Sequence, residues 1–240
     1  MSINLVKYVT INLNHYICGG GVFLFQVIQN VVPGYKGKGI HYTVLSKNEE
    51  ANCLTIMFPG LGYTVQGPLF HYATGLSLDS GMDVLHLKYS YEDSFYDSFT
   101  DEQIREAVIY DSGAVIDRVL EDQKYMNFHL IGKSFGTIAM SKEIRKDRFK
   151  GAKAVWLTPL LKNEAVFSCM KETTVNGLCL IGTQDHQYEE SRFNQVVSKS
   201  TMRGKLYPDL NHAMEYEEDP YKSIDVLKEI LRDIQQYLET

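Results

Sequence analysis

Five short hydrophobic runs recur along the chain, and each is followed within two residues by a glycine, proline or serine. The runs are residues 53–58, 83–89, 127–131, 152–157 and 177–181. Near-continuous apolar runs of this length are typical of strands that are buried on both faces. Segments with the period of a helix separate the runs, and this alternation predicts a mostly parallel sheet with helices on both faces. The pattern therefore predicts an α/β fold.

Two of the helical segments carry sequence signals at their N-terminal ends. Thr100 and Gln103 have the spacing of a capping box, in which each side chain bonds the backbone N–H of the other residue. Asp219 stands before Pro220, which combines a capping acid with a proline at the first helical position. The apolar residues that follow at spacings of three and four are Ile224, Leu227, Leu231, Ile234 and Leu238. These signals predict helices that begin directly after Thr100 and Asp219.

The first 36 residues show the weakest pattern. Residues 3–12 alternate between apolar and polar as in a strand, and three glycines at 19–21 would interrupt any regular element there. The most apolar stretch, residues 22–28, is far shorter than the roughly 20 apolar residues that a membrane span requires. The N-terminus also lacks the basic start and the small-residue cleavage site of a signal peptide. We expect a cytoplasmic protein with no integral membrane segment.

Composition and charge narrow the class of protein further. The chain has 240 residues, of which 44% are hydrophobic and 22% charged, and no stretch has the composition of a linker, so we expect one domain over residues 1–240. A net charge of −6 gives no electrostatic footprint for nucleic acid. The four cysteines form no CxxC pair, and no His/Cys cluster has zinc spacing. We therefore expect buried thiols, no metal and no nucleic-acid partner.

Residues 127–140 combine a strand, the sequence Gly-Lys-Ser-Phe-Gly at 132–136 and a helix. A serine on a sharp strand-to-helix turn needs small neighbours, because a Cβ at either glycine would collide with the adjacent strand or helix. Such a turn presents Ser134 Oγ at the carboxyl edge of the sheet, where the following helix aims N–H groups at a developing oxyanion. A phosphate-binding P-loop is the alternative, but it requires a glycine where this chain has Asn127. The pattern favours a nucleophilic serine.

Such a serine needs a general base and an acid that orients the base, which follow it in the order acid, then histidine. His186 and His212 are the histidines that follow Ser134. His186 comes directly after Asp185, and successive side chains diverge, so this pair is poorly suited to orient one another. His212 precedes the last helix and Asp185 follows a buried strand, which places both at the carboxyl edge of the sheet. We predict Ser134, Asp185 and His212 as the catalytic residues. The weaker alternatives for the acid are Asp209 and Glu164.

A second oxyanion donor is predicted in the sequence Phe-Pro-Gly-Leu-Gly-Tyr at 58–63, which follows the first strongly buried strand. Its glycines let the backbone turn so that the Leu61 N–H points inward beside the Phe135 N–H. Taken alone, the segment also fits an ordinary turn. The serine turn makes the oxyanion-loop interpretation the better one.

Together these residues resemble the α/β-hydrolase superfamily over residues 37–240, and residues 1–36 match none of its motifs. The resemblance implies an α/β-hydrolase core with Ser134 as the nucleophile, Asp185 as the acid and His212 as the base. It also implies backbone oxyanion donors at Leu61 and Phe135. Family members usually begin the oxyanion loop with His-Gly, whereas this chain has Pro59 and Gly60, which removes a side chain that often holds the loop.

The family commonly carries its lid after the sixth strand. Residues 160–176 leave room for one helix there, so we expect little or no cap domain and an open site. Two aromatic-rich segments, 63–70 and 89–99, are candidate walls of the substrate site, with a solvated loop as the alternative for each. The candidate substrate-binding residues are Tyr63, Lys133, Pro159 and Met214.

The predicted function is that of a serine hydrolase that cleaves a carboxylic ester or thioester of modest size through an acyl-enzyme on Ser134. An acyltransferase with the same three residues is one alternative. A non-catalytic ligand-binding protein on the same scaffold is another, and its mark would be a missing or misplaced catalytic residue. We expect a small-molecule substrate and no cofactor.

Overall fold

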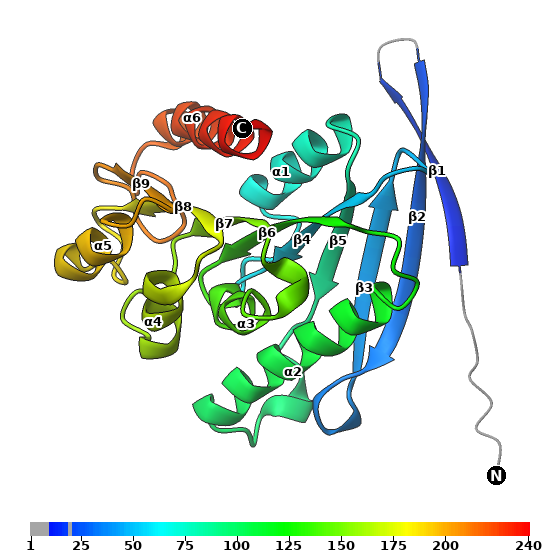
Figure 1. Ribbon diagram of the computed structural model, residues 1–240, viewed down its shortest axis with the longest axis horizontal. Helices are drawn as coiled ribbons and strands as arrows, with labels where there is room; N and C mark the ends of the chain where they lie inside the picture. The colour runs from blue at the N-terminus through cyan, green and yellow to red at the C-terminus, as the bar shows by residue number, and fades with distance from the viewer. Residues whose placement is uncertain (1–9, 19–20) are drawn as a thin grey trace.

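The computed structural model describes residues 10–18 and 21–240. In these residues one sheet of nine strands runs through the molecule in the order β1-β2-β3-β5-β4-β6-β7-β8-β9 (Figure 1). The strands are β1 (Thr10–Cys18), β2 (Gly21–Pro33), β3 (Gly39–Ser46), β4 (Cys53–Phe58), β5 (Asp83–Lys88), β6 (Asn127–Lys133), β7 (Lys153–Leu157), β8 (Asn176–Gly182) and β9 (Met202–Tyr207). From β5 to β9 all neighbours are parallel, whereas β1, β2 and β3 join this part as an antiparallel edge.

The five predicted strands are β4 to β8, and each begins and ends within two residues of its predicted bounds. They occupy the middle of the sheet, where side chains of both faces are buried. In β4, for example, Ile56 faces one core and Met57 the other, and both are fully buried. The continuous apolar runs therefore identified the strands that are covered on both sides.

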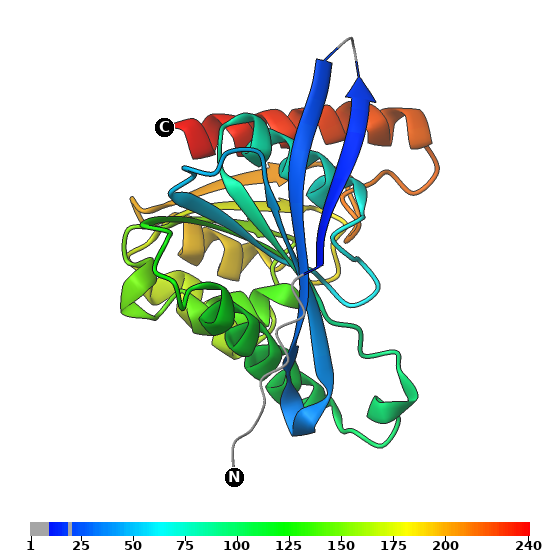
Figure 2. The same ribbon diagram turned by 90° about the vertical axis from the view of Figure 1, so that its right-hand side faces the viewer.

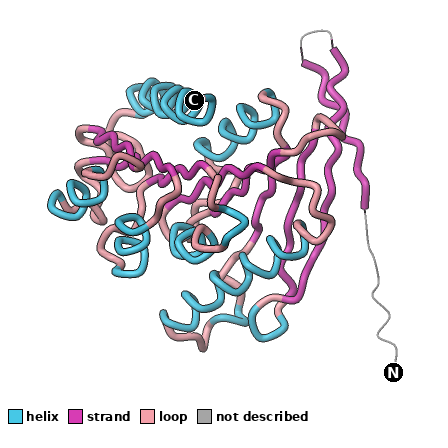
Figure 3. The backbone as a smooth tube through the Cα atoms, in the orientation of Figure 1, coloured by secondary structure: helices cyan, strands magenta, loops and turns pink. Residues whose placement is uncertain are grey.

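Helices cover both faces of the sheet, as Figure 3 shows in cyan. One face carries α1 (Pro68–Asp79) and α6 (Pro220–Glu239), and the other carries α2 (Asp101–Val119), α3 (Gly136–Glu143), α4 (Glu164–Glu172) and α5 (Glu190–Val197). Each set of helices packs on its own hydrophobic cluster, which makes three layers. The short 3-10 helices are η1 (Tyr35–Gly37), η2 (Ser94–Tyr96) and η3 (Asp147–Phe149). The predicted α/β fold with a mostly parallel sheet is confirmed.

Both predicted helix starts are confirmed. At α2, Thr100 Oγ1 accepts from the Gln103 N–H at 3.3 Å, and Gln103 Oε1 accepts from the Thr100 N–H at 3.0 Å. At α6, the Asp219 carboxylate accepts from the Lys222 N–H at 2.9 Å. These bonds satisfy backbone donors that have no partner inside the helix, and so they fix where each helix begins.

Residues 10–18 and 21–33 of the N-terminal region join the sheet as β1 and β2. Residues 10–12 of the predicted strand belong to β1, and its other residues, like Gly19 and Gly20, lie outside the described residues. Strands β1 and β2 form a long hairpin, and part of both strands projects beyond the helical layers in Figure 2. β2 pairs with β3 from Gln26 to Pro33, so the hairpin is continuous with the rest of the sheet.

The predicted absence of a large cap is confirmed for the described residues, because α4 is the one helix between β7 and β8. No helix in the described part of the chain is both long and apolar enough to cross a membrane. Cys169 and Cys179 are buried free thiols, as expected, but Cys53 is only partly buried because it begins the strand β4 at the edge of the core. For Cys53 the prediction of a buried thiol was wrong.

Candidate active site

Ser134 occupies the turn between β6 and α3, at the carboxyl edge of the sheet. Its φ of 51° lies in the left-handed region, which residues other than glycine rarely adopt. This backbone conformation costs on the order of 1–3 kcal/mol. The turn also packs tightly, since a Cβ on Gly136 would lie 2.1 Å from the carbonyl oxygen of Phe58. Ser134 itself remains partly exposed. The turn thus holds a reachable hydroxyl in a strained backbone conformation.

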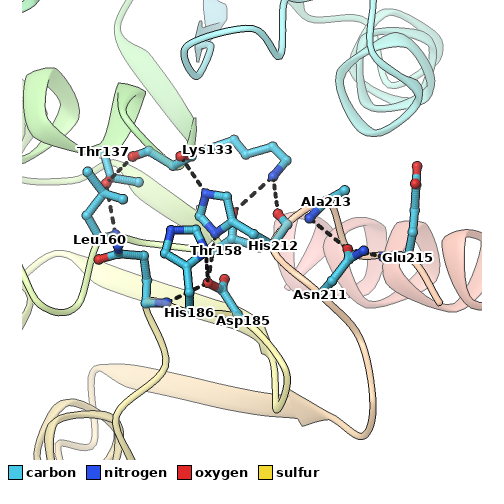
Figure 4. A network of polar contacts seen from close by, with 12 residues as sticks. Lys133, Thr137, Thr158, Leu160, Asp185, His186, Asn211, His212, Ala213 and Glu215 are labelled. Atoms are coloured by element: carbon cyan, nitrogen blue, oxygen red, sulfur yellow. Dashed lines mark hydrogen bonds and ion pairs between the residues drawn. The ribbon is translucent and has the colours of Figure 1, made fainter. Parts of the chain in front are cut away.

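The three predicted catalytic side chains come together at this edge, where Figure 4 shows His212 beside Asp185. His212 Nε2 lies 2.7 Å from Ser134 Oγ, and His212 Nδ1 lies 2.8 Å from Asp185 Oδ1. The Asp185 side chain is fully buried, and its Oδ1 also accepts from the Gln187 N–H at 2.8 Å. Because an ionised carboxylate only accepts hydrogen bonds, the neutral imidazole carries its proton on Nδ1 and turns its Nε2 lone pair toward Ser134.

The two alternative acids, Glu164 and Asp209, are engaged elsewhere. Glu164 pairs with Arg192 at 3.2 Å and accepts from the Ser168 hydroxyl. Asp209 follows β9 and has a φ of 62°, and its N–H donates to Thr183 Oγ1. Asp185 is therefore the acid that reaches the His212 ring.

His186 lies closer to this group than the sequence suggested. We expected its side chain to diverge from that of Asp185, but the exposed ring turns back, so that its Nδ1 lies 3.8 Å from Asp185 Oδ1. The centroids of the His186 and His212 rings are 4.5 Å apart. A turn, in place of an extended strand, carries both residues, and the alternation rule for successive side chains does not apply there.

Lys133 is fully buried one residue before the turn serine. Its ammonium group donates to the carbonyl oxygen of His212 at 2.7 Å and to Thr158 Oγ1 at 3.0 Å, and it lies 4.6 Å from the centre of the Tyr63 ring. Burial lowers the pKa of Lys133 to about 8, although the nearby charges of Asp185 and Glu215 act to raise it. Lys133 thus ties the end of β6 to the loop that carries His212.

A buried tyrosine holds the loop after β4. Tyr89 donates a hydrogen bond of 2.6 Å to the carbonyl oxygen of Pro59, and burial raises the pKa of its hydroxyl well above the usual value. Next to Pro59, a Cβ on Gly60 would lie 3.3 Å from Ser134 Cβ, so this loop lies against the serine. Tyr91 stacks on Tyr89 at 5.4 Å between ring centroids and donates to Asp111 at 2.9 Å.

The Tyr89 contact was missed by sequence reasoning, which identified the segment 89–99 only as a candidate wall. The available signal was the missing His-Gly at the start of the loop, because a loop without that side chain needs another support.

A pocket of about 460 Å³ lies beside the loop that carries His212, between the N-terminal ends of α1 and α6. Its wall includes Tyr63, Leu69, Ala213, Met214, Glu215 and Leu227. Two of the four candidate substrate-binding residues, Tyr63 and Met214, therefore line it. The other two, Lys133 and Pro159, are buried and are not part of its wall.

No family model and no curated protein sequence matches the chain. Solved structures do match it at low sequence identity. The chain is similar to a protein of unknown function from Agrobacterium tumefaciens that is assigned to the α/β hydrolases, with 18% identity, a TM-score of 0.68, and coverage of 88% of this chain and 94% of that chain.

Two further structures extend this similarity. One is a cold-adapted esterase from an Arctic intertidal metagenomic library, with 14% identity, a TM-score of 0.66, and coverage of 95% of this chain and 99% of that chain. The other is an α/β serine hydrolase without a lid from Xanthomonas campestris, with 14% identity, a TM-score of 0.64, and coverage of 89% and 96%. The chain therefore has the α/β-hydrolase fold.

The packing of the serine turn predicts that Gly136→Ala lowers the free energy of unfolding by about 2–3 kcal/mol, because the added Cβ meets the backbone of a central strand. The matched control is Gly75→Ala in α1, where a Cβ meets nothing within 4 Å and where alanine favours the helix by up to about 1 kcal/mol. Urea unfolding of both variants measures the difference. Equal stability of the two variants would contradict this packing.

The buried lysine predicts a pH-dependent stability. Because the folded-state pKa of Lys133 is lowered to about 8, the folded protein binds fewer protons than the unfolded chain between about pH 8 and the ordinary lysine pKa of 10.5. The stability of the wild type relative to Lys133→Met should therefore rise with pH across this window, by up to about 3 kcal/mol. Urea unfolding of both proteins at several pH values measures this difference, in which groups common to both cancel. A pH-independent difference would contradict a buried ammonium group.

Proposed function

We propose that the protein is a serine hydrolase that cleaves a carboxylic ester or thioester of modest size. The observation that carries this proposal is the continuous series of contacts from Ser134 Oγ through the His212 ring to the Asp185 carboxylate, with distances of 2.7 and 2.8 Å. A hydroxyl that donates a hydrogen bond to the unprotonated nitrogen of a neutral imidazole is an activated nucleophile.

In the proposed reaction, His212 Nε2 takes the Ser134 proton while Oγ forms a bond to the carbonyl carbon of the substrate. The carbonyl oxygen becomes an oxyanion, and Asp185 stabilises the imidazolium. The imidazolium then gives its proton to the departing alcohol or thiol, and the acyl group stays on Ser134. A water molecule that His212 deprotonates attacks this acyl-enzyme, and collapse of the second tetrahedral intermediate releases the acid and restores the serine.

The oxyanion would be bound by the backbone N–H groups of Leu61 and Phe135. The contact of Gly60 with Ser134 supports this assignment for the loop, and the start of α3 directly after Phe135 supports it for the turn. Because a donor must already be in place when the charge develops, the bond from Tyr89 to Pro59 would keep the loop preorganised.

The pocket beside His212 is the proposed site for one side of the substrate, with Tyr63 and Met214 in contact with it. The residues that the structure describes form no large cap over this pocket, and one of the similar structures is an esterase, which supports an ester substrate of modest size. Since the Lys133 ammonium group bonds the His212 carbonyl oxygen, we assign Lys133 a positioning role.

The non-catalytic alternative is disfavoured by the same distances, because a binding protein that had lost turnover would have no need to keep His212 within hydrogen-bond reach of both partners. Transfer of the acyl group to an acceptor other than water would use the same first half of the reaction.

A p-nitrophenyl ester assay tests the hydrolase. We expect turnover of short-chain p-nitrophenyl esters by the wild type and a loss of about 10⁴-fold or more in kcat for Ser134→Ala. Ser191→Ala, an exposed serine on α5, is the control and should keep full activity. The far-UV circular dichroism of both variants should match that of the wild type. Turnover that survives in folded Ser134→Ala would rule out Ser134 as the nucleophile.

The support of the oxyanion loop gives a second test. Tyr89→Phe keeps the ring but removes the donor to the Pro59 carbonyl oxygen, so the loop loosens and kcat should fall by about tenfold to a hundredfold with little change in KM. Tyr72→Phe, a half-exposed tyrosine on α1, is the matched control and should leave both constants unchanged. A change in KM alone would instead place Tyr89 in substrate binding.

A further inference from the structure

Asp185, His186 and His212 present three metal-ligand atoms that all lie within 4.8 Å of one another. A tetrahedral Zn²⁺ ion with nitrogen and oxygen ligands at about 2.0–2.2 Å keeps its ligand atoms about 3.4 Å apart. Asp185 Oδ1 is 2.8 Å from His212 Nδ1 and 3.8 Å from His186 Nδ1, so the two measured distances lie on either side of this spacing. Small movements would bring all three atoms to one ion.

The exposure of the His186 side chain allows its part of these movements. His186 is two-thirds exposed, so its ring can rotate without disturbing the core, and its ring already lies 4.5 Å from that of His212. Figure 4 shows both histidines next to Asp185.

The Asp185 carboxylate supplies the second reason to expect a ligand. Its Oδ1 is fixed by the Gln187 N–H, whereas its Oδ2 is buried and has no hydrogen-bond partner among the described residues. A buried carboxylate oxygen without a partner costs free energy, which a cation bound to the Asp185 carboxylate would recover. One carboxylate and two imidazoles form a donor set that suits Zn²⁺ and not Mg²⁺ or Ca²⁺, which prefer oxygen ligands alone.

We propose that Asp185, His186 and His212 bind one Zn²⁺ ion and that this ion reversibly inhibits the protein. With Zn²⁺ on Nδ1 of the neutral His212 imidazole, the single ring proton moves to Nε2. Nε2 then donates a hydrogen bond to Ser134 and cannot accept its proton. The binding of zinc stands on the geometry of the three side chains, and only the inhibition rests on the proposed hydrolase function.

Zinc binding is measured first, without any use of activity. Zn²⁺ alone is titrated into the 240-residue wild type, Ser134→Ala, His186→Ala and His41→Ala by calorimetry, with His41 as an exposed control histidine on β3. We expect one ion per chain for the wild type, Ser134→Ala and His41→Ala, and an affinity lower by at least about tenfold for His186→Ala. No binding by the wild type, or equal affinity after loss of His186, would overturn the proposed site.

The inhibition is measured with the p-nitrophenyl ester assay. Zn²⁺ should abolish turnover by the wild type and a chelator should restore it, while Mg²⁺ should have no effect. His186→Ala should keep the basal rate and require at least about tenfold more Zn²⁺ for half-inhibition. Zinc binding without any esterase activity would leave the site standing and refute the hydrolase. Esterase activity that zinc does not inhibit would refute the proposed switch.

Discussion

The hydrogen bond between the buried Asp185 carboxylate and His212 Nδ1 is the interaction on which the rest of the site depends. It decides which ring nitrogen carries the proton, and therefore whether Ser134 meets a lone pair or an N–H group. The sheet makes the bond possible, because Ser134 follows β6, Asp185 follows β8 and His212 follows β9, and these parallel strands end at one edge. The same bond explains the zinc proposal, since a metal ion on Nδ1 would reverse the proton positions that the carboxylate imposes.

Two buried side chains hold the loops around this bond. Lys133 fixes the His212 loop through its carbonyl oxygen, and Tyr89 fixes the loop after β4 through Pro59. Both are costly to bury, as the lowered pKa of the lysine and the raised pKa of the tyrosine indicate. Together with the positive φ of Ser134, they place several unfavourable contributions to the free energy of folding at one edge of the sheet. The packed layers on both faces offset these contributions.

Much of this architecture can be predicted from short segments of the sequence. The strands β4 to β8 are buried on both faces and read as continuous apolar runs, and the caps of α2 and α6 act within three residues. The chain order of serine, acid and histidine was enough to identify the three candidate residues from the sequence alone. Tertiary contacts escaped this reasoning. Nothing next to Lys133 in the sequence indicates that its ammonium group bonds a carbonyl 79 positions away, and the turn that brings His186 back to Asp185 has no motif.

Covalent labelling shows whether Ser134 Oγ is a nucleophile that His212 activates. The folded protein is treated with a fluorophosphonate, and the modified peptide is identified by mass spectrometry. We expect one adduct, on Ser134, that is absent from Ser134→Ala and forms far more slowly on His212→Ala. A folded wild-type protein that takes up no label, or takes it up on another residue, would contradict this role of Ser134.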